Sequence, residues 1–306
     1  RSYLLQNDGK GKFSDVTSSY SKDLMNPGMV TDAHFVDLDK DGKKDLLLSS
    51  AWGTIDAYFK KGNTYNKQTL LKENGWWQSL TVTDINADGS LDIIAGNFGL
   101  NSRLKASSAE PVTMYINDFD NNGRAEQVIT YYLNGKEIPF ASKIQLEKSL
   151  PVLKKKFLYA EDFAKASLDQ LFEKEKLNKS IQLKATQFAN MVLLNKGKLG
   201  FEAVAMPANA QLTNYRAVIP FKHQDQKLNS YLLLGNFGYN NIEIGKQDAD
   251  FGTMLQWSAN GQPKAHLIEQ LLVEGEVRKA ALIKIGNSTC YILAKNNGAV
   301  QVLKTR

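Results

Sequence analysis

The chain has few of the residues that carry out most enzyme chemistry. Its 306 residues include three histidines, His34, His223 and His266, and one cysteine, Cys290. A lone cysteine in an apolar run behaves as a small hydrophobic residue, and it cannot form a disulfide within the chain. No Gly-x-Ser-x-Gly elbow and no His-Glu-x-x-His helix occurs. These absences argue against the common serine-hydrolase and zinc-protease mechanisms.

Long apolar runs and a concentrated basic patch are also missing. No run reaches the roughly 18 apolar residues that a membrane-spanning helix needs, so no membrane span is expected. The net charge is +6, but the lysines are scattered, and the one dense run (154–156) is typical of a solvated helix face. No basic patch interleaved with aromatic residues appears, so nucleic acid is not expected as a partner. The first residues predict a strand rather than a signal peptide, as in a mature N-terminus or a fragment of a longer chain.

Three acidic segments share one pattern. They cover residues 37–45, 84–92 and 118–126, here called loop 1, loop 2 and loop 3. Each has a carboxylate or amide at positions 1, 3, 5 and 9, and a glycine at position 6. Apolar or alternating stretches lie on both sides, which predicts a strand, a tight loop and a second strand. The candidate ligands are Asp37, Asp39, Asp41 and Asp45, then Asp84, Asn86, Asp88 and Asp92, then Asp118, Asp120, Asn122 and Glu126.

Such a loop suits a calcium ion. Ca²⁺ takes six to eight oxygen ligands, and alternate positions of a tight turn bring three side chains to one side. Without an ion, so many neighbouring carboxylates would repel one another. An EF-hand is excluded because position 12 of each loop lies in an apolar, strand-like run. The alternative is an Asp/Gly turn without metal. With four aspartates, loop 1 is expected to bind most tightly.

Two further patterns recur. The segment Gly-Asn-Phe-Gly stands at 96–99 and 235–238, and the hairpin-like segment 4–13 is echoed at 192–201. Alignment on the first echo places a fourth loop whose positions fall on His223, Asp225, Lys227 and Tyr231. With one acid and a lysine, it predicts a structural repeat without metal. Short strands with regular turn signals indicate a propeller or a sandwich.

Residues 143–180 depart from this pattern. Apolar residues recur there at helical spacing, with Pro151 and Ser167 placed to begin helices. This predicts a small helical insertion. It either decorates the fold or forms one wall of a partner site.

The loops, the 4–13 hairpin and the Gly-Asn-Phe-Gly elements together resemble the FG-GAP/VCBS repeats of integrin-α-like propellers, in particular the exported bacterial type. The resemblance is clear over 1–140 and fainter over 182–306. It implies an all-β fold, with residues 1–306 forming a single β-propeller of five or six blades. It also implies Ca²⁺ in the three loops and a location outside the cytoplasm, in the periplasm, on the cell surface or secreted.

The resemblance brings no catalytic activity with it. We therefore expect a non-enzymatic binding or scaffold module for a protein or a carbohydrate. Trp52, Trp76 and Trp77 either pack between blades or offer a ligand platform. Because adjacent strand residues point to opposite faces, one of Trp76 and Trp77 is expected to be exposed. The alternative is a hydrolase or lyase that acts on polysaccharide from a propeller scaffold.

Overall fold

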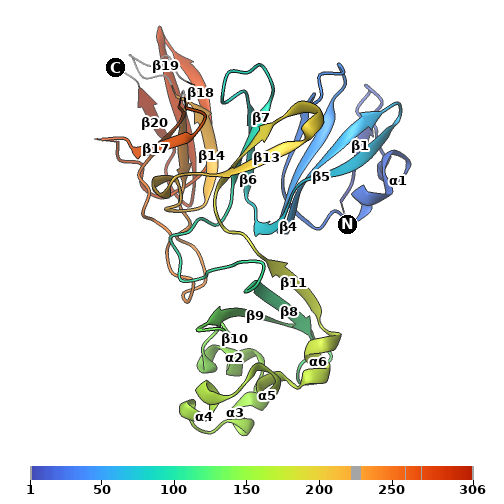
Figure 1. Cartoon of the computed structure of the whole chain (residues 1–306), viewed down its shortest axis with the longest axis vertical. Coiled ribbons are helices and arrows are strands. Elements are labelled where there is room, and N and C mark those ends of the chain that lie inside the picture. Colours follow the sequence, from blue (N-terminus) through green and yellow to red (C-terminus); the bar gives the residue numbers. More distant parts are fainter. Residues whose placement is uncertain (1, 222–228, 259, 270, 305–306) are drawn as a thin grey trace. The chain divides into compact units, whose positions relative to one another are not determined.

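The computed structural model describes residues 2–221, 229–258, 260–269 and 271–304. This part of the chain is mostly strands in antiparallel sheets, which agrees with the predicted all-β class. The chain divides into two compact units (Figure 1). Unit 1 combines the residues up to Ser102 with those from Phe188 onward, and unit 2 is Arg103–Gln187. That residues 1–306 form a single propeller stays a prediction.

Unit 1 has five antiparallel sheets in its described residues. The smallest pairs β1 (Leu5–Asn7) with β2 (Phe13–Asp15). The other four have the strand orders β3-β4-β5, β6-β7-β12-β13, β14-β15-β16-β17 and β18-β19-β20, and the first strand of each lies at an edge. Their strands are β3 (Met29–Val36), β4 (Asp45–Lys61), β5 (Thr64–Trp76), β6 (Ser79–Thr83), β7 (Asp92–Gly96), β12 (Met191–Asn195), β13 (Phe201–Ala205), β14 (Tyr215–Pro220), β15 (Ser230–Gly235), β16 (Thr253–Trp257), β17 (Pro263–Leu267), β18 (Glu276–Ile285), β19 (Ser288–Asn296) and β20 (Gln301–Lys304).

Short helical turns connect some of these strands. They are α1 (Thr17–Tyr20), η1 (Lys22–Met25), η2 (Gly197–Leu199) and η3 (Ala208–Ala210). Unit 2 is inserted within one sheet, because the chain leaves after β7 and returns as β12, which pairs with β7.

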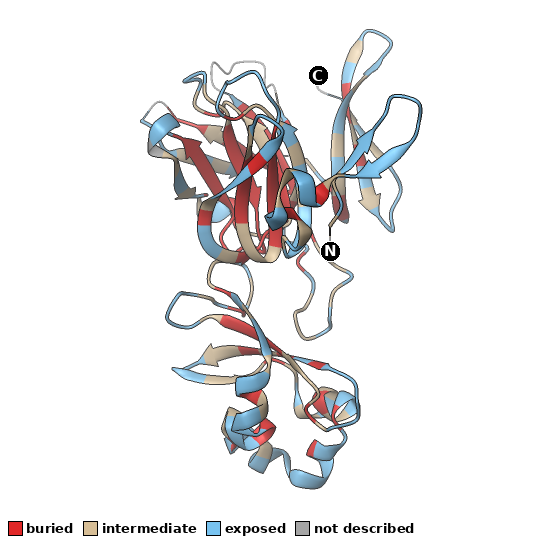
Figure 2. Cartoon of the chain, turned by 90° about the vertical axis from the view of Figure 1, so that its right-hand side faces the viewer, coloured by how far each residue is buried: buried red, intermediate tan, exposed pale blue. Residues whose placement is uncertain are grey.

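The sheets of unit 1 are packed face to face. Adjacent residues of a central strand point to opposite faces of the sheet, so their side chains pack in different cores. Ile93 packs with Leu47 and Leu193 in one core, while Ile94 packs with Leu233 in the next. β7 and β12 are buried along their whole length, since both of their faces are covered. Figure 2 shows this buried material concentrated in the strands of unit 1.

The stack continues through the last two large sheets. Leu232 and Leu234 of β15 share a core with Leu293 of β19. The first strands of the four large sheets, β3, β6, β14 and β18, follow one another side by side. They also line one common cavity of about 420 Å³. The four large sheets therefore stack in chain order, with their first strands on the same side of the stack.

The Gly-Asn-Phe-Gly echoes mark close backbone packing. A Cβ atom at Gly96 would lie 2.0 Å from the carbonyl oxygen of Tyr215, in the next sheet. A Cβ atom at Gly235 would lie 1.9 Å from the carbonyl oxygen of Asn214, just before the neighbouring strand. Only glycine fits at such distances. The echo is therefore explained by packing rather than by a ligand.

Unit 2 is a four-stranded sheet covered by helices (Figure 1). Its strand order is β10-β9-β8-β11, and Tyr115, Phe119 and Val128 pack against Leu146 and Phe172 of the helices. The apolar spacing from 146 to 172 thus corresponds to residues that face this core. The elements are β8 (Val112–Asn117), β9 (Glu126–Leu133), β10 (Lys136–Pro139), α2 (Lys143–Ser149), α3 (Val152–Lys156), α4 (Ala160–Lys165), α5 (Leu168–Phe172), α6 (Lys174–Lys179) and β11 (Ile181–Ala185). Across the described ranges, no helix has both the length and the apolar character needed to cross a bilayer.

Candidate metal centres

Each acidic loop closes a β-hairpin at the same point. Loop 1 joins β3 to β4, loop 2 joins β6 to β7, and loop 3 joins β8 to β9. Position 9, which is Asp45, Asp92 or Glu126, is the first residue of the second strand in all three. Loops 1 and 2 lie in unit 1 and loop 3 in unit 2.

The loops turn through two residues with left-handed backbone. Position 4 has φ near +60° in every loop, at Lys40, Ala87 and Asn121, and the glycine at position 6 has φ between 83° and 86°. A left-handed conformation costs a residue with a side chain about 1–2 kcal/mol. Lys40 and Ala87 therefore hold a strained conformation, which the hydrogen bonds of the loop must offset. The result is that the amides of positions 5, 6 and 7 point at the acidic side chains.

These hydrogen bonds repeat from loop to loop. In loop 1 the carboxylate of Asp37 accepts the amides of Asp41 (3.1 Å) and Gly42 (3.0 Å), and Asp39 accepts the Asp41 amide (3.3 Å). Asp41 in turn accepts the Lys43 amide at 2.9 Å. The same four bonds occur at 2.7–3.1 Å in loop 2 and at 2.8–3.2 Å in loop 3. The three loops thus have one backbone design.

The acid at position 9 closes each loop from inside. Asp45 and Asp92 are fully buried and Glu126 is 9% exposed. Each accepts the amide of position 2 of its loop, at 2.9–3.1 Å. Asp45 also accepts the Lys60 amide (2.9 Å), and Asp92 accepts the Asn195 amide (2.8 Å). These carboxylates therefore hold the loop to the sheet whether or not an ion is bound.

Burial leaves two of these carboxylates short of stabilisation. It raises the pKa of Asp45 although two amides oppose the rise, and repulsion from Asp39 and Asp41 adds to it. It likewise raises the pKa of Asp92, with Asp88 among the acids that add to the rise. A nearby cation would act in the opposite direction, because it favours the charged form of a carboxylate.

Two of the loops bring three acids to one point. In the described part of the chain, single carboxylate oxygens lie within 4.8 Å of one another in two groups, which are Asp37, Asp39 and Asp45 in loop 1, and Asp118, Asp120 and Glu126 in loop 3. Two ligands of one Ca²⁺ at about 2.4 Å can be no more than about 4.8 Å apart. The spacing and the all-oxygen donor set therefore fit a hard divalent cation.

Position 5 is not part of either group. The carboxylate of Asp41 faces Lys43, with the ammonium nitrogen 3.0 Å away, and Lys43 lowers the pKa of Asp41 through this hydrogen bond. In loop 3, Asn122 accepts the Arg124 amide. The predicted ligands thus separate into positions 1, 3 and 9, which converge, and position 5, which supports the turn.

Loop 2 has the turn but not the triad. Asn86 stands at position 3, where loops 1 and 3 have Asp39 and Asp120. Its side-chain nitrogen donates to Asp88 at 2.9 Å, and its oxygen accepts the Asp88 amide at 3.0 Å. The described acids of loop 2 consequently do not form a group of three.

The structure describes only part of the predicted fourth loop. His223, Asp225 and Lys227 lie outside the described residues. Tyr231 is buried in β15, and its hydroxyl shares a 2.6 Å hydrogen bond with the Thr83 hydroxyl. Where the other loops have an acid at position 9, the fourth loop therefore has the buried side chain of Tyr231.

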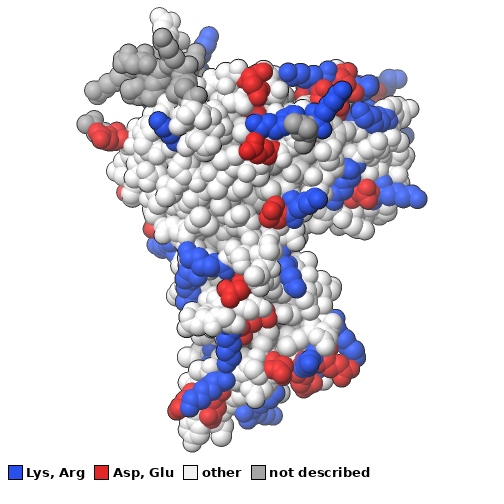
Figure 3. Space-filling view, in the orientation of Figure 1, with Lys and Arg blue, Asp and Glu red and all other residues white. Residues whose placement is uncertain are grey.

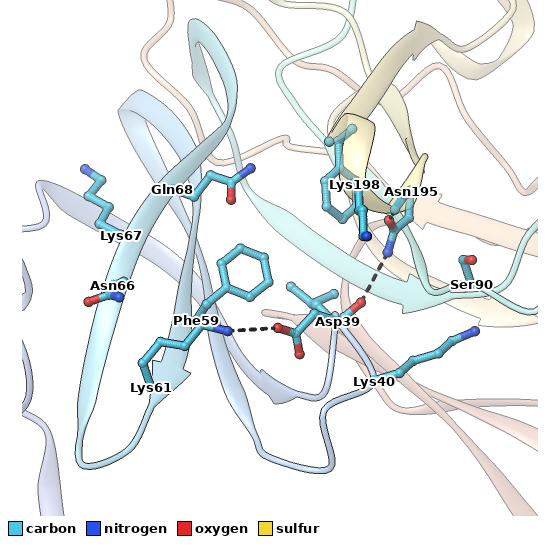
Figure 4. Close-up of a pocket in the computed structure, with 14 residues that line it drawn as sticks. Asp39, Lys40, Phe59, Lys61, Asn66, Lys67, Gln68, Ser90, Asn195 and Lys198 are labelled. Carbon is cyan, nitrogen blue, oxygen red and sulfur yellow. Dashed lines mark hydrogen bonds and ion pairs between the residues drawn. The ribbon is translucent and has the colours of Figure 1, made fainter.

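Asn195 is a site residue that the sequence did not single out. Besides its backbone bond to Asp92, its side-chain nitrogen lies 3.2 Å from the carbonyl oxygens of Leu38 in loop 1 and Leu91 in loop 2. Figure 4 shows Asn195 directed toward loop 1. It therefore links the two loops of unit 1. Sequence reasoning treated it as a turn residue of the 192–201 echo.

A polar cavity of about 530 Å³ lies beside loops 1 and 2. Figure 4 shows Asp39 at its edge, with Phe59 and Gln68 on the facing strands. Of its four lysines, Lys61 is 3.6 Å from Asp39 and Lys67 is 3.1 Å from Asp56. The other two are Lys40 and Lys198.

The tryptophan prediction is wrong for the adjacent pair. Trp76 is 9% exposed and Trp77 is fully buried. Trp76 packs on Trp52, Phe98 and Phe188 with ring centroids 4.8–5.0 Å apart. Both directions out of the strand lead into packed sheets, so alternation exposes neither ring.

A comparison with protein families gives one match. The model of the FG-GAP-like repeat matches residues 37–95. The chain contains an FG-GAP-like repeat. The matched segment runs from the first residue of loop 1 through loop 2 and nearly to the end of β7, so the repeat unit includes both acidic loops of unit 1. The resemblance to FG-GAP repeat proteins is thus confirmed. No curated protein matches the chain in a sequence search.

Proposed function

We propose that this FG-GAP repeat chain is a calcium-binding β-propeller module that binds a protein or a carbohydrate outside the cytoplasm. The observation that carries the proposal is the convergence of positions 1, 3 and 9 in loops 1 and 3. A bound Ca²⁺ would supply positive charge to a set of carboxylates that otherwise repel one another, one of which is buried in each loop. The role of the ion would be structural, because each loop ties two strands of a sheet.

The stack of sheets supports the propeller. Four sheets follow one another face to face, and their first strands β3, β6, β14 and β18 line a common cavity. Propeller blades have this arrangement around a central channel. FG-GAP repeats also favour it, since they form blades in the family that the chain resembles.

Ligand binding is proposed at the polar cavity beside loops 1 and 2. Its walls combine amide, lysine and phenylalanine side chains, as in sites that bind polar ligands. Ser90 of loop 2 and Asp39 of loop 1 both line it, so metal in the loops would order its walls. Charges of both signs are interspersed on the face in Figure 3, which favours a polar ligand over nucleic acid.

We further propose binding without turnover. Asp37 and Asp45 of loop 1 each accept two backbone amides, which suits a structural role better than proton transfer. A hydrolase or lyase acting on polysaccharide is the alternative. Incubation with a panel of neutral and acidic polysaccharides separates the two, because the alternative requires new reducing ends or unsaturated products, whereas the module binds and releases its ligand unchanged.

Thermal unfolding of chelator-stripped protein tests the calcium site. Titration with Ca²⁺ should raise Tm, since an ion that binds only the native state stabilises it, by about 2.7 kcal/mol at 100 times Kd. The rise should shrink in Asp39→Asn with Asp120→Asn and persist in Asp23→Asn, an exposed aspartate outside the loops. An equal response to Mg²⁺, or no response to either ion, would contradict the proposal.

A further inference from the structure

A second cavity lies where the four large sheets of unit 1 meet. Each of β3, β6, β14 and β18 contributes two or three residues to its lining, and its volume is about 420 Å³. Val36, Val82 and Val218 give it an apolar wall. None of the described residues that line it carries a carboxylate, although Arg216, Lys279 and His34 do line it.

The charges at one side of this cavity are balanced. His34 Nε2 lies 3.3 Å from the carboxylate of Asp32, which also accepts the Leu80 amide at 2.9 Å. Burial works to raise the pKa of Asp32, but the His34 hydrogen bond, the Leu80 amide and the charge of Lys279 together bring it below its ordinary value. Asp32 thus places a negative charge beside His34 and within the field of Lys279.

Arg216 lies beside a second arginine, Arg278. Its guanidinium lies 5.9 Å from the ring centre of Phe237, and that of Arg278 lies 5.6 Å from the same ring. Arg278 pairs with Glu276 at 2.7 Å, whereas no described carboxylate lies within 4 Å of Arg216. The Nε of Arg216 is buried and makes no hydrogen bond with any described atom. Burial, with repulsion from Arg278, lowers the pKa of Arg216 to about 10, although the charge of Glu276 opposes this shift.

We infer that this cavity is a binding site for a small oxyanion, a carboxylate or phosphate group, which Arg216 holds with support from Lys279. A guanidinium presents two parallel donors to such a group, and a charge-assisted pair is strong where water is partly excluded. The anion would give Arg216 a direct ion pair, which no described carboxylate supplies. The valine wall would accept a short aliphatic chain, so a small organic acid fits better than a free inorganic ion.

Isothermal titration with succinate and with sulfate, at constant ionic strength and in the presence of calcium, tests the site. Wild-type protein should bind succinate at one site, and more tightly than sulfate. Arg216→Gln should weaken succinate binding by about tenfold or more, as loss of a charge-assisted hydrogen bond predicts. Lys279→Gln should weaken it by a smaller factor, because Asp32 already shares that charge.

Lys264→Gln is the matched control, since it removes one exposed lysine of β17 in the same unit. Its affinity for succinate should equal that of wild type. Absence of succinate binding to the wild-type protein would overturn the inference, as would equal weakening in Lys264→Gln and Lys279→Gln. If Arg216→Gln does not fold, the contrast between Lys279→Gln and Lys264→Gln decides. This site is independent of the calcium loops, so its failure would leave the proposed function in place.

Discussion

Loops 1 and 2 have the same backbone and different side-chain geometry. Both make the same amide-to-carboxylate bonds, and both have left-handed residues at positions 4 and 6. Yet three acids converge in loop 1 and not in loop 2, whose position 3 is Asn86. In loop 3, which lies in the other unit, three acids converge as they do in loop 1, although position 5 is Asn122.

This comparison separates two properties of the loop. The hydrogen bonds that all three loops share set the turn, and position 3 makes its bond to the position 5 amide whether it is Asp or Asn. Position 3 sets how many acids can reach one ion. The number of acids alone would rank loop 1 first in calcium affinity, with the other two loops below it. From the geometry we instead expect stronger sites in loops 1 and 3 and a weaker site in loop 2.

The largest expected effect comes from position 9, where the two loops are alike. Asp45→Ala would leave the amides of Leu38 and Lys60 without their acceptor, and Asp92→Ala those of Ile85 and Asn195. Each unpaired buried amide costs about 1–3 kcal/mol, so either variant should lose about 2–4 kcal/mol of unfolding free energy. Urea unfolding in chelator measures this loss.

Asp23→Asn, on the surface outside the loops, provides the control and should change stability by less than about 0.5 kcal/mol. A loss in Asp45→Ala as small as the control's would mean that position 9 is a ligand alone and not part of the scaffold.

Exchange of position 3 should reverse the difference between the loops. Asn86→Asp gives loop 2 its third carboxylate, and Asp39→Asn removes that of loop 1. We expect about a tenfold gain and a tenfold loss in calcium affinity, or about 1.4 kcal/mol each. Calcium titration by calorimetry follows both. Equal affinities before and after exchange would show that position 3 does not set the strength of the site.

Removal of the link between the loops should have a smaller effect. Asn195→Ala deletes the side-chain bonds to Leu38 and Leu91, and the bond that the side-chain oxygen accepts from the Gly197 amide, while leaving the backbone bond to Asp92. Each bond is worth about 0.5–1.5 kcal/mol, so stability should fall by about 1–2 kcal/mol, and the calcium response of both loops in unit 1 should weaken. A loss confined to loop 1 or to loop 2 would argue against a link.

The smallest expected effect is on the pH dependence of stability, to which Asp92 and Asp88 of loop 2 contribute in opposite directions. Burial raises the pKa of Asp92 from 3.8, so in metal-free protein its contribution to stability is present below that value and is lost as pH rises through the folded pKa. The Ser90 amide chiefly lowers the pKa of Asp88, so its contribution is present above 3.8 and is lost as pH falls. Stability profiles in chelator should therefore change in opposite directions for Asp92→Asn and Asp88→Asn. Parallel changes would contradict these environments.

Local features could be predicted from the sequence. The acid and glycine spacing located all three loops between strands. The helical spacing of leucine and phenylalanine corresponds to the core of unit 2. Each of these signals involves residues fewer than about 30 positions apart, where spacing reports geometry directly.

Long-range features could not be predicted. Burial of both Trp76 and Trp77 depends on sheets that are distant in the chain, and the Asn195 link joins residues 104 and 157 positions apart. The different roles of positions 3 and 5 could not be predicted either, because spacing does not tell which carboxylates converge on one point. The cavity that Arg216 lines could not be predicted either, because four sheets together form it.

Equilibrium dialysis against Ca²⁺ tests the central claim most directly. Chelator-stripped protein and the double variant Asp39→Asn with Asp120→Asn are dialysed side by side, and bound calcium is counted by mass spectrometry. We expect two stronger sites and one weaker site in the wild-type protein, and loss of the two stronger ones in the variant. No bound calcium in the wild type, or an equal count in both proteins, would contradict it.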